Sequence, residues 1–133
     1  MTSINKTRAV ILIVSLVFTF VIIRALLFLY PNADFNVAGY NIHHFYTGLL
    51  LITLGGIPLT LFSNPSKILD LATAIFGIGL SLALDEWVYL IATDGSNLSY
   101  LLPVSFWGGV IVVGLTCLYI GILYFWSRNR HNT

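Results

Sequence analysis

The chain has 133 residues, of which 58% are hydrophobic and only 8% are charged, whereas a soluble domain carries about 25% charged residues. Its formal net charge is +1 and its mean hydropathy is +0.93. This composition excludes a soluble globular surface and indicates a multi-pass protein of the cell membrane. Nucleic acid is excluded as a partner, because no basic stretch is long enough to follow a phosphate backbone.

Four apolar runs are each long enough to cross a bilayer, which takes about 20 residues. They cover residues 9–30, 42–62, 68–91 and 106–126. We therefore predict an all-α fold in which residues 1–133 form a single transmembrane domain, a four-helix bundle surrounded by membrane lipid.

Residues at the ends of these runs agree with this layout. The first helix is expected to end at Tyr30, because the residue before a proline is disfavoured in helical conformation. Asn41 is predicted to cap the second helix, and Pro65 suits the start of the third. Four aromatic residues fall near the predicted interfaces, where we expect them to act as anchors: Tyr40, Tyr100, Trp107 and Trp126.

The basic residues near the helix ends all lie on one side of the predicted bundle. They are Lys6, Arg8, Lys67, Arg128 and Arg130. The two connections on the opposite side contain Asp34 and Asp94 but no lysine or arginine. Because basic segments stay in the cytoplasm, both termini are predicted to be cytoplasmic.

Five ionisable side chains are predicted to share one layer near the outer end of the bundle. Arg24 lies six residues from the end of the first helix, about 9 Å below it. Asp85 and Glu86 lie at a similar depth in the third helix, while His43 and His44 open the second helix from the same side. With neutral histidines, this layer carries one excess negative charge.

An ionisable group inside a membrane costs at least about 2.5 kcal/mol, so we expect the excess charge to be neutralised. A protonated histidine, a proton on one carboxyl group and a bound metal cation are three ways to do this. The candidate metal ligands are His43, His44, Asp85 and Glu86, a set that suits Zn, Mn or Fe as a divalent cofactor. The candidate catalytic residues are His44, Glu86 and Arg24.

Helical spacing predicts how these side chains point. Small residues follow His44 and precede Asp85 at helical spacing, and small residues allow close helix packing. This places His44 and Asp85 between the second and third helices. His43 and Glu86 are each expected to point about 100° away, which favours two or three ligands at one point over four.

The segments His43-His44-Phe45-Tyr46-Thr47-Gly48, read as HHxxxG, and Gly77-Ile78-Gly79 with Asp85-Glu86 carry a resemblance. Over the second and third helices, roughly half the chain, the sequence resembles a group of uncharacterised small prokaryotic four-helix integral membrane proteins. That group has no assigned activity, so the resemblance marks the same four residues and implies no substrate.

Three functions fit these observations. The first is a membrane enzyme whose site opens toward the outer leaflet, binds a divalent metal and acts on a lipid-like substrate, with Arg24 available for an anionic group. The second is an ion or proton pathway in a homo-oligomer, through His44, Asp85 and Glu86. The third is an accessory subunit of another membrane protein, in which the Arg24–Asp85 pair only fixes helix packing.

Overall fold

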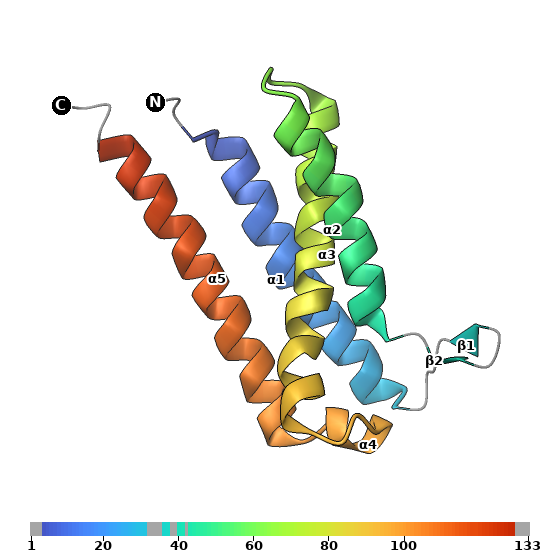
Figure 1. Ribbon diagram of the computed structural model, residues 1–133. Helices are drawn as coiled ribbons and strands as arrows, with labels where there is room; N and C mark the ends of the chain where they lie inside the picture. The colour runs from blue at the N-terminus through green and yellow to red at the C-terminus, as the bar shows by residue number, and fades with distance from the viewer. Residues whose placement is uncertain (1–3, 32–35, 38–39, 42, 130–133) are drawn as a thin grey trace.

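The computed structural model describes residues 4–31, 36–37, 40–41 and 43–129. Four long helices form the bundle: α1 (Lys6–Leu29), α2 (His44–Leu61), α3 (Lys67–Ala92) and α5 (Pro103–Asn129) (Figure 1). The connections hold the strands β1 (Asn36–Val37) and β2 (Tyr40–Asn41), which pair antiparallel, and the short helix α4 (Asn97–Tyr100). All four long helices are long and apolar enough to cross a membrane. The predicted multi-pass helical bundle is confirmed.

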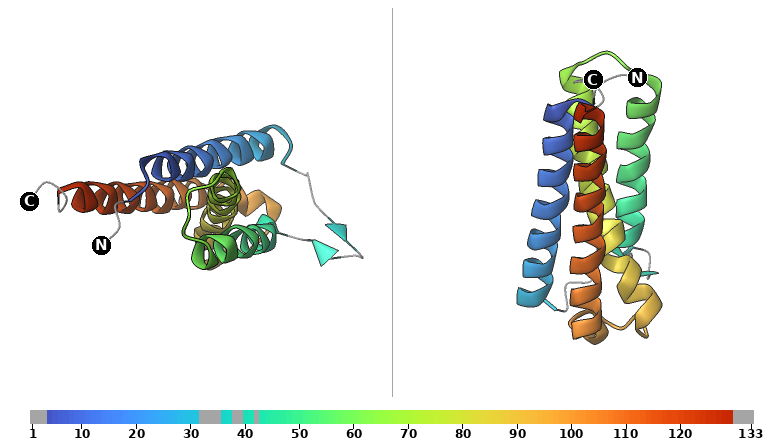
Figure 2. Two further views of the ribbon diagram at one scale, coloured as in Figure 1. Left: turned by 90° about the horizontal axis from the view of Figure 1, so that it is seen from above. Right: turned by 90° about the vertical axis from the view of Figure 1, so that its left-hand side faces the viewer.

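Helix α3 is the central element of the bundle. Seen along the bundle axis, it lies between α1 and α2, and α5 packs on a third side (Figure 2). In its most apolar stretch 44% of the residues are buried, against 11–17% in the other three long helices. A polar residue on α3 is therefore buried whichever of these three sides it faces.

Small residues hold α2 close to α3. A Cβ atom added to Gly55 would lie 2.6 Å from the backbone oxygen of Ala72, and one added to Gly79 would lie 2.7 Å from the oxygen of Gly48. Such short distances mean that the two backbones touch, which only glycine permits. Close backbone contact of this kind is how membrane helices associate without a hydrophobic driving force.

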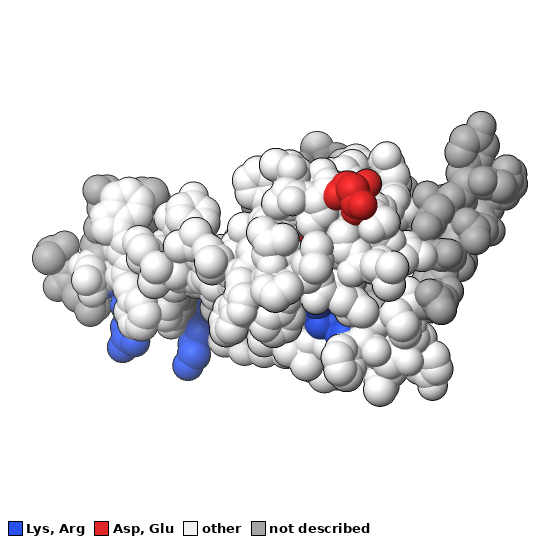
Figure 3. All heavy atoms as spheres, turned by 90° about the horizontal axis from the view of Figure 1, so that it is seen from below, with Lys and Arg blue, Asp and Glu red and all other residues white. Residues whose placement is uncertain are grey.

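The apolar core lies in the middle of the bundle, between α1, α3 and α5. Leu16 and Phe20 of α1 and Val113 of α5 are buried there, with Leu80 and Leu84 of α3 packed against them. Many large apolar side chains instead face outward. A view from the end that carries α4 shows a mostly uncharged surface with an acidic group and a few basic groups (Figure 3). An outward apolar surface of this extent matches lipid as the solvent.

Two predicted helix boundaries are wrong, and the start of α3, Lys67, lies one residue before the predicted residue 68. His43 holds the cap position of α2, whereas Asn41 belongs to β2, where it pairs with Asn36. Helix α3 starts two residues after Pro65, because Ser66 takes the cap position and its side chain accepts a hydrogen bond from the Leu69 N–H. Helix α5 begins at Pro103 rather than at residue 106, since the first helical turn tolerates a proline.

Both ends of the described chain lie at the same end of the bundle (Figure 1). The Ile4 N–H donates to the Ser127 hydroxyl at 3.1 Å, which ties the start of α1 to the end of α5. This is the arrangement that four spans require. The cytoplasmic location of that end stays a prediction from the distribution of basic residues.

The glycine contacts predict that the effect of a glycine-to-alanine substitution on stability depends strongly on its position. Gly55→Ala should lower the free energy of unfolding by about 1–3 kcal/mol, because its methyl group would overlap the α3 backbone. Gly114→Ala, which has no atom within 4 Å of the new Cβ, should change it by less than about 0.5 kcal/mol. Unfolding by SDS in mixed micelles measures both values, and equal effects would contradict the packing.

The topology predicts opposite labelling of two exposed loop positions. In a Cys117→Ala background, Leu98→Cys should react with a membrane-impermeant maleimide added to intact cells, and Ser63→Cys should react only after the membrane is opened, because the two residues lie at opposite ends of the bundle. Labelling of both cysteines from the same side would rule out four spans.

Candidate functional site

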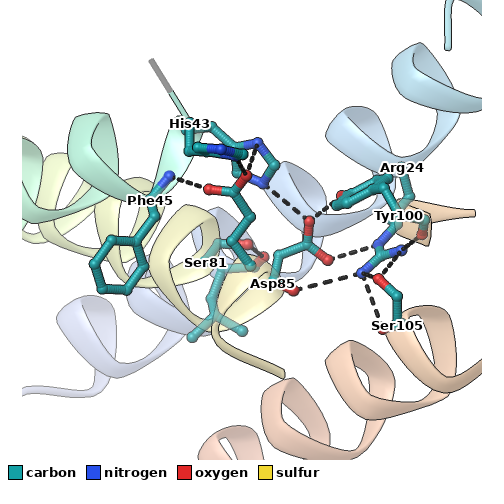
Figure 4. Close-up of polar contacts among 10 residues, drawn as sticks. Arg24, His43, Phe45, Ser81, Asp85, Tyr100 and Ser105 are labelled. Carbon is teal, nitrogen blue, oxygen red and sulfur yellow. Dashed lines mark hydrogen bonds and ion pairs between the residues drawn. The ribbon is translucent and has the colours of Figure 1, made fainter. Parts of the chain in front are cut away.

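The buried carboxylate of Asp85 is the centre of a polar cluster at the end of the bundle that carries α4 (Figure 4). Arg24 of α1 donates from Nε to Oδ1 of Asp85 at 2.6 Å, and the Asp85 side chain is fully buried. His44 Nε2 lies 3.1 Å from Oδ2, and the Tyr100 hydroxyl donates to the same oxygen. One carboxylate thus joins side chains from α1, α2 and α4.

All three guanidinium nitrogens of Arg24 donate to protein acceptors. Besides the Nε contact, Nη1 donates to the Tyr100 backbone oxygen at 3.2 Å, and Nη2 donates to the Ser105 backbone oxygen at 3.0 Å. The Ser105 hydroxyl lies 3.3 Å from both Nη atoms. Arg24, proposed from the sequence to bind an anionic group, is thus used in this structure to hold Asp85, α4 and α5 together.

Glu86 caps α2 from a different helix. His43 occupies the cap position of α2 but makes no side-chain cap hydrogen bond, and the Phe45 N–H of the first turn donates to Oε2 of Glu86. A carboxylate at a helix N-terminus is also stabilised by the helix dipole. Oε1 of Glu86 lies 2.9 Å from His43 Nδ1 and 3.5 Å from His44 Nδ1.

His44 lies between the two carboxylates. Its Nε2 faces Asp85 at 3.1 Å, while its Nδ1 faces Glu86 at 3.5 Å. Only the imidazolium form can donate from both ring nitrogens. The structure thus places both ring nitrogens of His44 beside carboxylate oxygens, which is the arrangement that neutralisation by a protonated histidine would require.

His43 and Glu86 join this cluster, although helical spacing predicted that they point away from it. The prediction failed for His43 because this residue precedes α2 and has extended backbone, with ψ at 141°. It failed for Glu86 because α2 packs beside α3 on the side that this residue faces, so neighbouring residues of α3 can both be buried. All four candidate ligands therefore lie in one hydrogen-bonded cluster.

The spacing argument used the small residues that precede Asp85 to place this face of the third helix against the second. In the structure these residues face α1 instead. The Ser81 hydroxyl donates to the Leu16 backbone oxygen at 2.8 Å, and a Cβ on Gly77 would lie 2.9 Å from the Ser15 side chain. Asp85 sits where this face meets the α2 side, so it reaches both Arg24 and His44.

Tyr100 is the site residue that sequence reasoning missed, since it was expected to anchor the protein at the interface. It is only 6% exposed, and its ring centroid lies 4.1 Å from the Arg24 guanidinium carbon. Burial, and then the nearby Asp85 carboxylate, raise the pKa of the Tyr100 hydroxyl, which therefore stays protonated and donates. Ser96 is a sequence signal for this position, because its side chain caps the short helix α4 that carries Tyr100 over the cluster.

The cluster contacts do not have the geometry of a metal centre. In the described ranges, no group of three or more His, Cys, Asp or Glu residues has the arrangement to hold a metal ion. The imidazoles contact the carboxylates directly, at 2.9 and 3.1 Å, and the carboxylate oxygens already accept hydrogen bonds from Arg24, Tyr100 and the Phe45 N–H. The predicted divalent metal stays a prediction without geometric support.

A cavity of about 500 Å³ borders the cluster on the side of α1, α4 and α5. Its walls are mostly apolar, with Phe28 of α1 and Trp107 of α5 among the lining residues. Arg24 and Tyr100 are the members of the cluster that line it. Phe28 and Trp107 are 75% and 58% exposed, so this cavity opens to the outside of the bundle, where a molecule dissolved in lipid can enter it.

Comparison of the chain with protein-family models, with curated proteins and with solved structures found no match. The resemblance stated from the HHxxxG and DE segments thus stays a prediction, and the function is argued from the geometry of the site alone.

The Arg24–Asp85 pair predicts a large coupling in a double-mutant cycle. Arg24→Gln or Asp85→Asn alone should each lower the free energy of unfolding by about 3–5 kcal/mol, because a buried charge is left without its partner. The double variant should lose less than the sum of the two single losses.

A second pair in the same protein serves as the control. Arg8 and Asp70, whose side chains are 20% and 36% exposed, lie 3.3 Å apart. Their coupling should stay below about 1 kcal/mol, as for other partly solvated pairs. SDS unfolding measures both cycles, and equal couplings would show that burial does not decide the strength of the Arg24–Asp85 pair.

Proposed function

We propose that the protein is a membrane enzyme that binds a lipid-like molecule in the cavity between α1, α4 and α5 and protonates an oxygen of that molecule. The observation that carries this proposal is a continuous chain of contacts that runs from His43 to the cavity wall. The chain passes through Glu86, His44 and Asp85 and ends at Tyr100, which lines the cavity.

Each contact in this chain joins two groups that exchange protons. A protonated His44 first gives its proton to Asp85. The Tyr100 hydroxyl, which donates to Asp85 in the resting structure, then turns its proton to the substrate oxygen and takes the Asp85 proton on its own oxygen, and His44 ends neutral. The net transfer is one proton from His44 to the substrate. Side chains of this kind, held within hydrogen-bond reach of one another, are the usual means of general acid–base catalysis.

The histidines also provide the return route for protons. The His43 side chain is 27% exposed and the His44 side chain is 19% exposed, whereas the two carboxylates are almost completely buried. A proton taken up by His43 reaches His44 through Glu86, which restores the starting state. In this series of contacts, the partly exposed end at His43 thus takes up protons, and the end at the cavity delivers them.

The cavity predicts which molecule binds. A long-chain alcohol or ester would place its chain against Phe28, Phe106 and Trp107 and its oxygen at Tyr100. Binding can be measured with a diazirine-bearing hexadecanol added to the protein in nanodiscs, with the labelled peptides mapped by mass spectrometry. Label should fall on α1 and α5 next to the cavity.

Matched variants separate binding in the cavity from contact with the lipid surface. Ala25→Trp fills the cavity from α1 and should reduce the label strongly, whereas Ile22→Trp, on the same helix but outside the cavity, should not. Label that is insensitive to both variants would mean that the probe only coats the outer surface.

The acid–base role predicts a separate loss of turnover. Incubation of the protein with a polar lipid extract, followed by lipid mass spectrometry, should show products that fall by about 10²–10⁴-fold with His44→Gln or Tyr100→Phe, while probe labelling persists. Element analysis of the same samples tests the metal hypothesis. Absence of turnover in a wild-type protein that keeps its coupling and its label would favour a purely structural cluster.

A further inference from the structure

A second cavity, of about 890 Å³, lies at the opposite end of the bundle from the Asp85 cluster, the end where the described chain begins and ends. All four long helices or their immediate ends contribute to its wall. Lining residues that matter for the argument are Arg8, Leu12, Leu59, Thr73, Ile120 and Leu123. None of them takes part in the site described above.

Arg8 brings an incompletely satisfied cation to this cavity. Its Nε donates to Asp70 Oδ1 at 3.3 Å. Its Nη2 is buried. Among the buried side-chain nitrogen and oxygen atoms of the described residues, Nη2 is the one without a hydrogen-bond partner. A buried donor without an acceptor costs about 1–3 kcal/mol, more when it is charged, so the protein satisfies this guanidinium incompletely. The exposed part of the side chain lines the cavity, where an anion can pair with its charge.

The contrast with Arg24 shows that this is a specific property of Arg8. All three Arg24 nitrogens donate to acceptors of the protein itself. Arg8 has a single carboxylate contact, through Nε, and that carboxylate is 36% exposed. The guanidinium of Arg24 is thus fully paired inside the fold, whereas the guanidinium of Arg8 is only partly paired by the protein.

The surroundings of Arg8 fit a molecule with an anionic head and an apolar tail. Leu12, Leu59, Ile120 and Leu123 provide apolar wall, while Asn5, Thr60 and Ser63 provide polar groups at the same cavity. The same end of the bundle carries Lys6, Lys67 and Arg128 in addition to Arg8, against Asp70 as the acidic residue among the described ones. Basic pockets between membrane helices typically bind the phosphate groups of anionic lipids.

We propose that this cavity is a binding site for one anionic phospholipid. The phosphate pairs with the part of the Arg8 guanidinium that lines the cavity, since this side chain is 20% exposed, and an acyl chain lies along the apolar wall formed by α1, α2 and α5. The Ile4–Ser127 hydrogen bond joins α1 to α5 near the rim of the cavity, so lipid binding should stabilise this end of the bundle. This site goes beyond the proposed enzyme function and is independent of it.

The test compares phosphatidylglycerol with phosphatidylcholine, which share acyl chains but differ in net charge. Purified protein in a neutral detergent is titrated with each lipid, and thermal unfolding and native mass spectrometry report stabilisation and stoichiometry. Phosphatidylglycerol should bind with one high-affinity molecule per chain. Arg8→Gln should weaken that binding by about tenfold, the usual value of one charge-assisted hydrogen bond.

Three variants keep the result interpretable. Arg128→Gln removes an exposed basic residue that does not line the cavity, and it should change the affinity by less than about twofold. Leu123→Trp fills the cavity while it leaves Arg8 in place, and it should also abolish tight binding. Asp70→Asn removes the carboxylate that pairs with Arg8 and leaves the charge of Arg8 in place, so it should preserve binding. That result would show that loss of the ion pair alone does not cause the weaker binding of Arg8→Gln.

Two results would overturn the proposal. Equal affinity for the two lipids would show that the site does not select a net negative charge. An Arg8→Gln protein that binds phosphatidylglycerol as tightly as wild type would show that Arg8 does not bind the headgroup. Stabilisation by inorganic phosphate equal to that by phosphatidylglycerol, and unaffected by Leu123→Trp, would identify a site for a free anion instead of a lipid. Failure of the lipid-turnover experiment at His44 would not affect either measurement.

Discussion

A fully buried carboxylate, that of Asp85, is the constraint on which the half of the bundle next to α4 depends. Removing such a group from water costs several kcal/mol, and the cost is offset only when its partners are placed accurately. Arg24, His44 and Tyr100 come from three different helices and meet at this one residue. Because lipid provides no hydrophobic force between helices, these polar contacts fix the relative depth of α1, α2 and α4 on α3.

The sequence was sufficient to predict the spans and the shared layer of Arg24, His44 and Asp85, because apolar length and residue depth follow directly from the rise of a helix. It was not sufficient for His43 and Glu86. The helical period applies only inside a helix, and His43 lies before one. It also assumes one buried face, whereas α3 is packed on three sides. Tyr100 was missed because its position depends on how the short helix α4 folds back, which no periodic pattern in four residues reveals.

Arg24 and Arg8, both on α1, show how the same side chain serves two purposes. Arg24 is saturated by protein acceptors and is stacked near the rings of Phe20, Tyr100 and Phe106, so it acts as a fixed structural cation. Arg8 keeps a buried nitrogen without a partner beside a large cavity. Position in the membrane does not decide this difference, since both lie near a helix end. The number of acceptors that the neighbouring helices supply decides it.

The middle of the bundle bears on the hypothesis of an ion pathway. Between Asp85 and Asp70, the polar side chains of α3 turn to backbone oxygens: the Ser81 hydroxyl donates to Leu16, and the Thr73 hydroxyl donates to Leu69. Leu16 and Phe20 fill the space beside them. A proton that enters at His43 therefore meets an apolar layer beyond Asp85 within the described part of one chain. Passage across the membrane would need a route between copies, whereas delivery to the cavity beside Tyr100 needs only the contacts already present, which is why the geometry favours local acid–base chemistry.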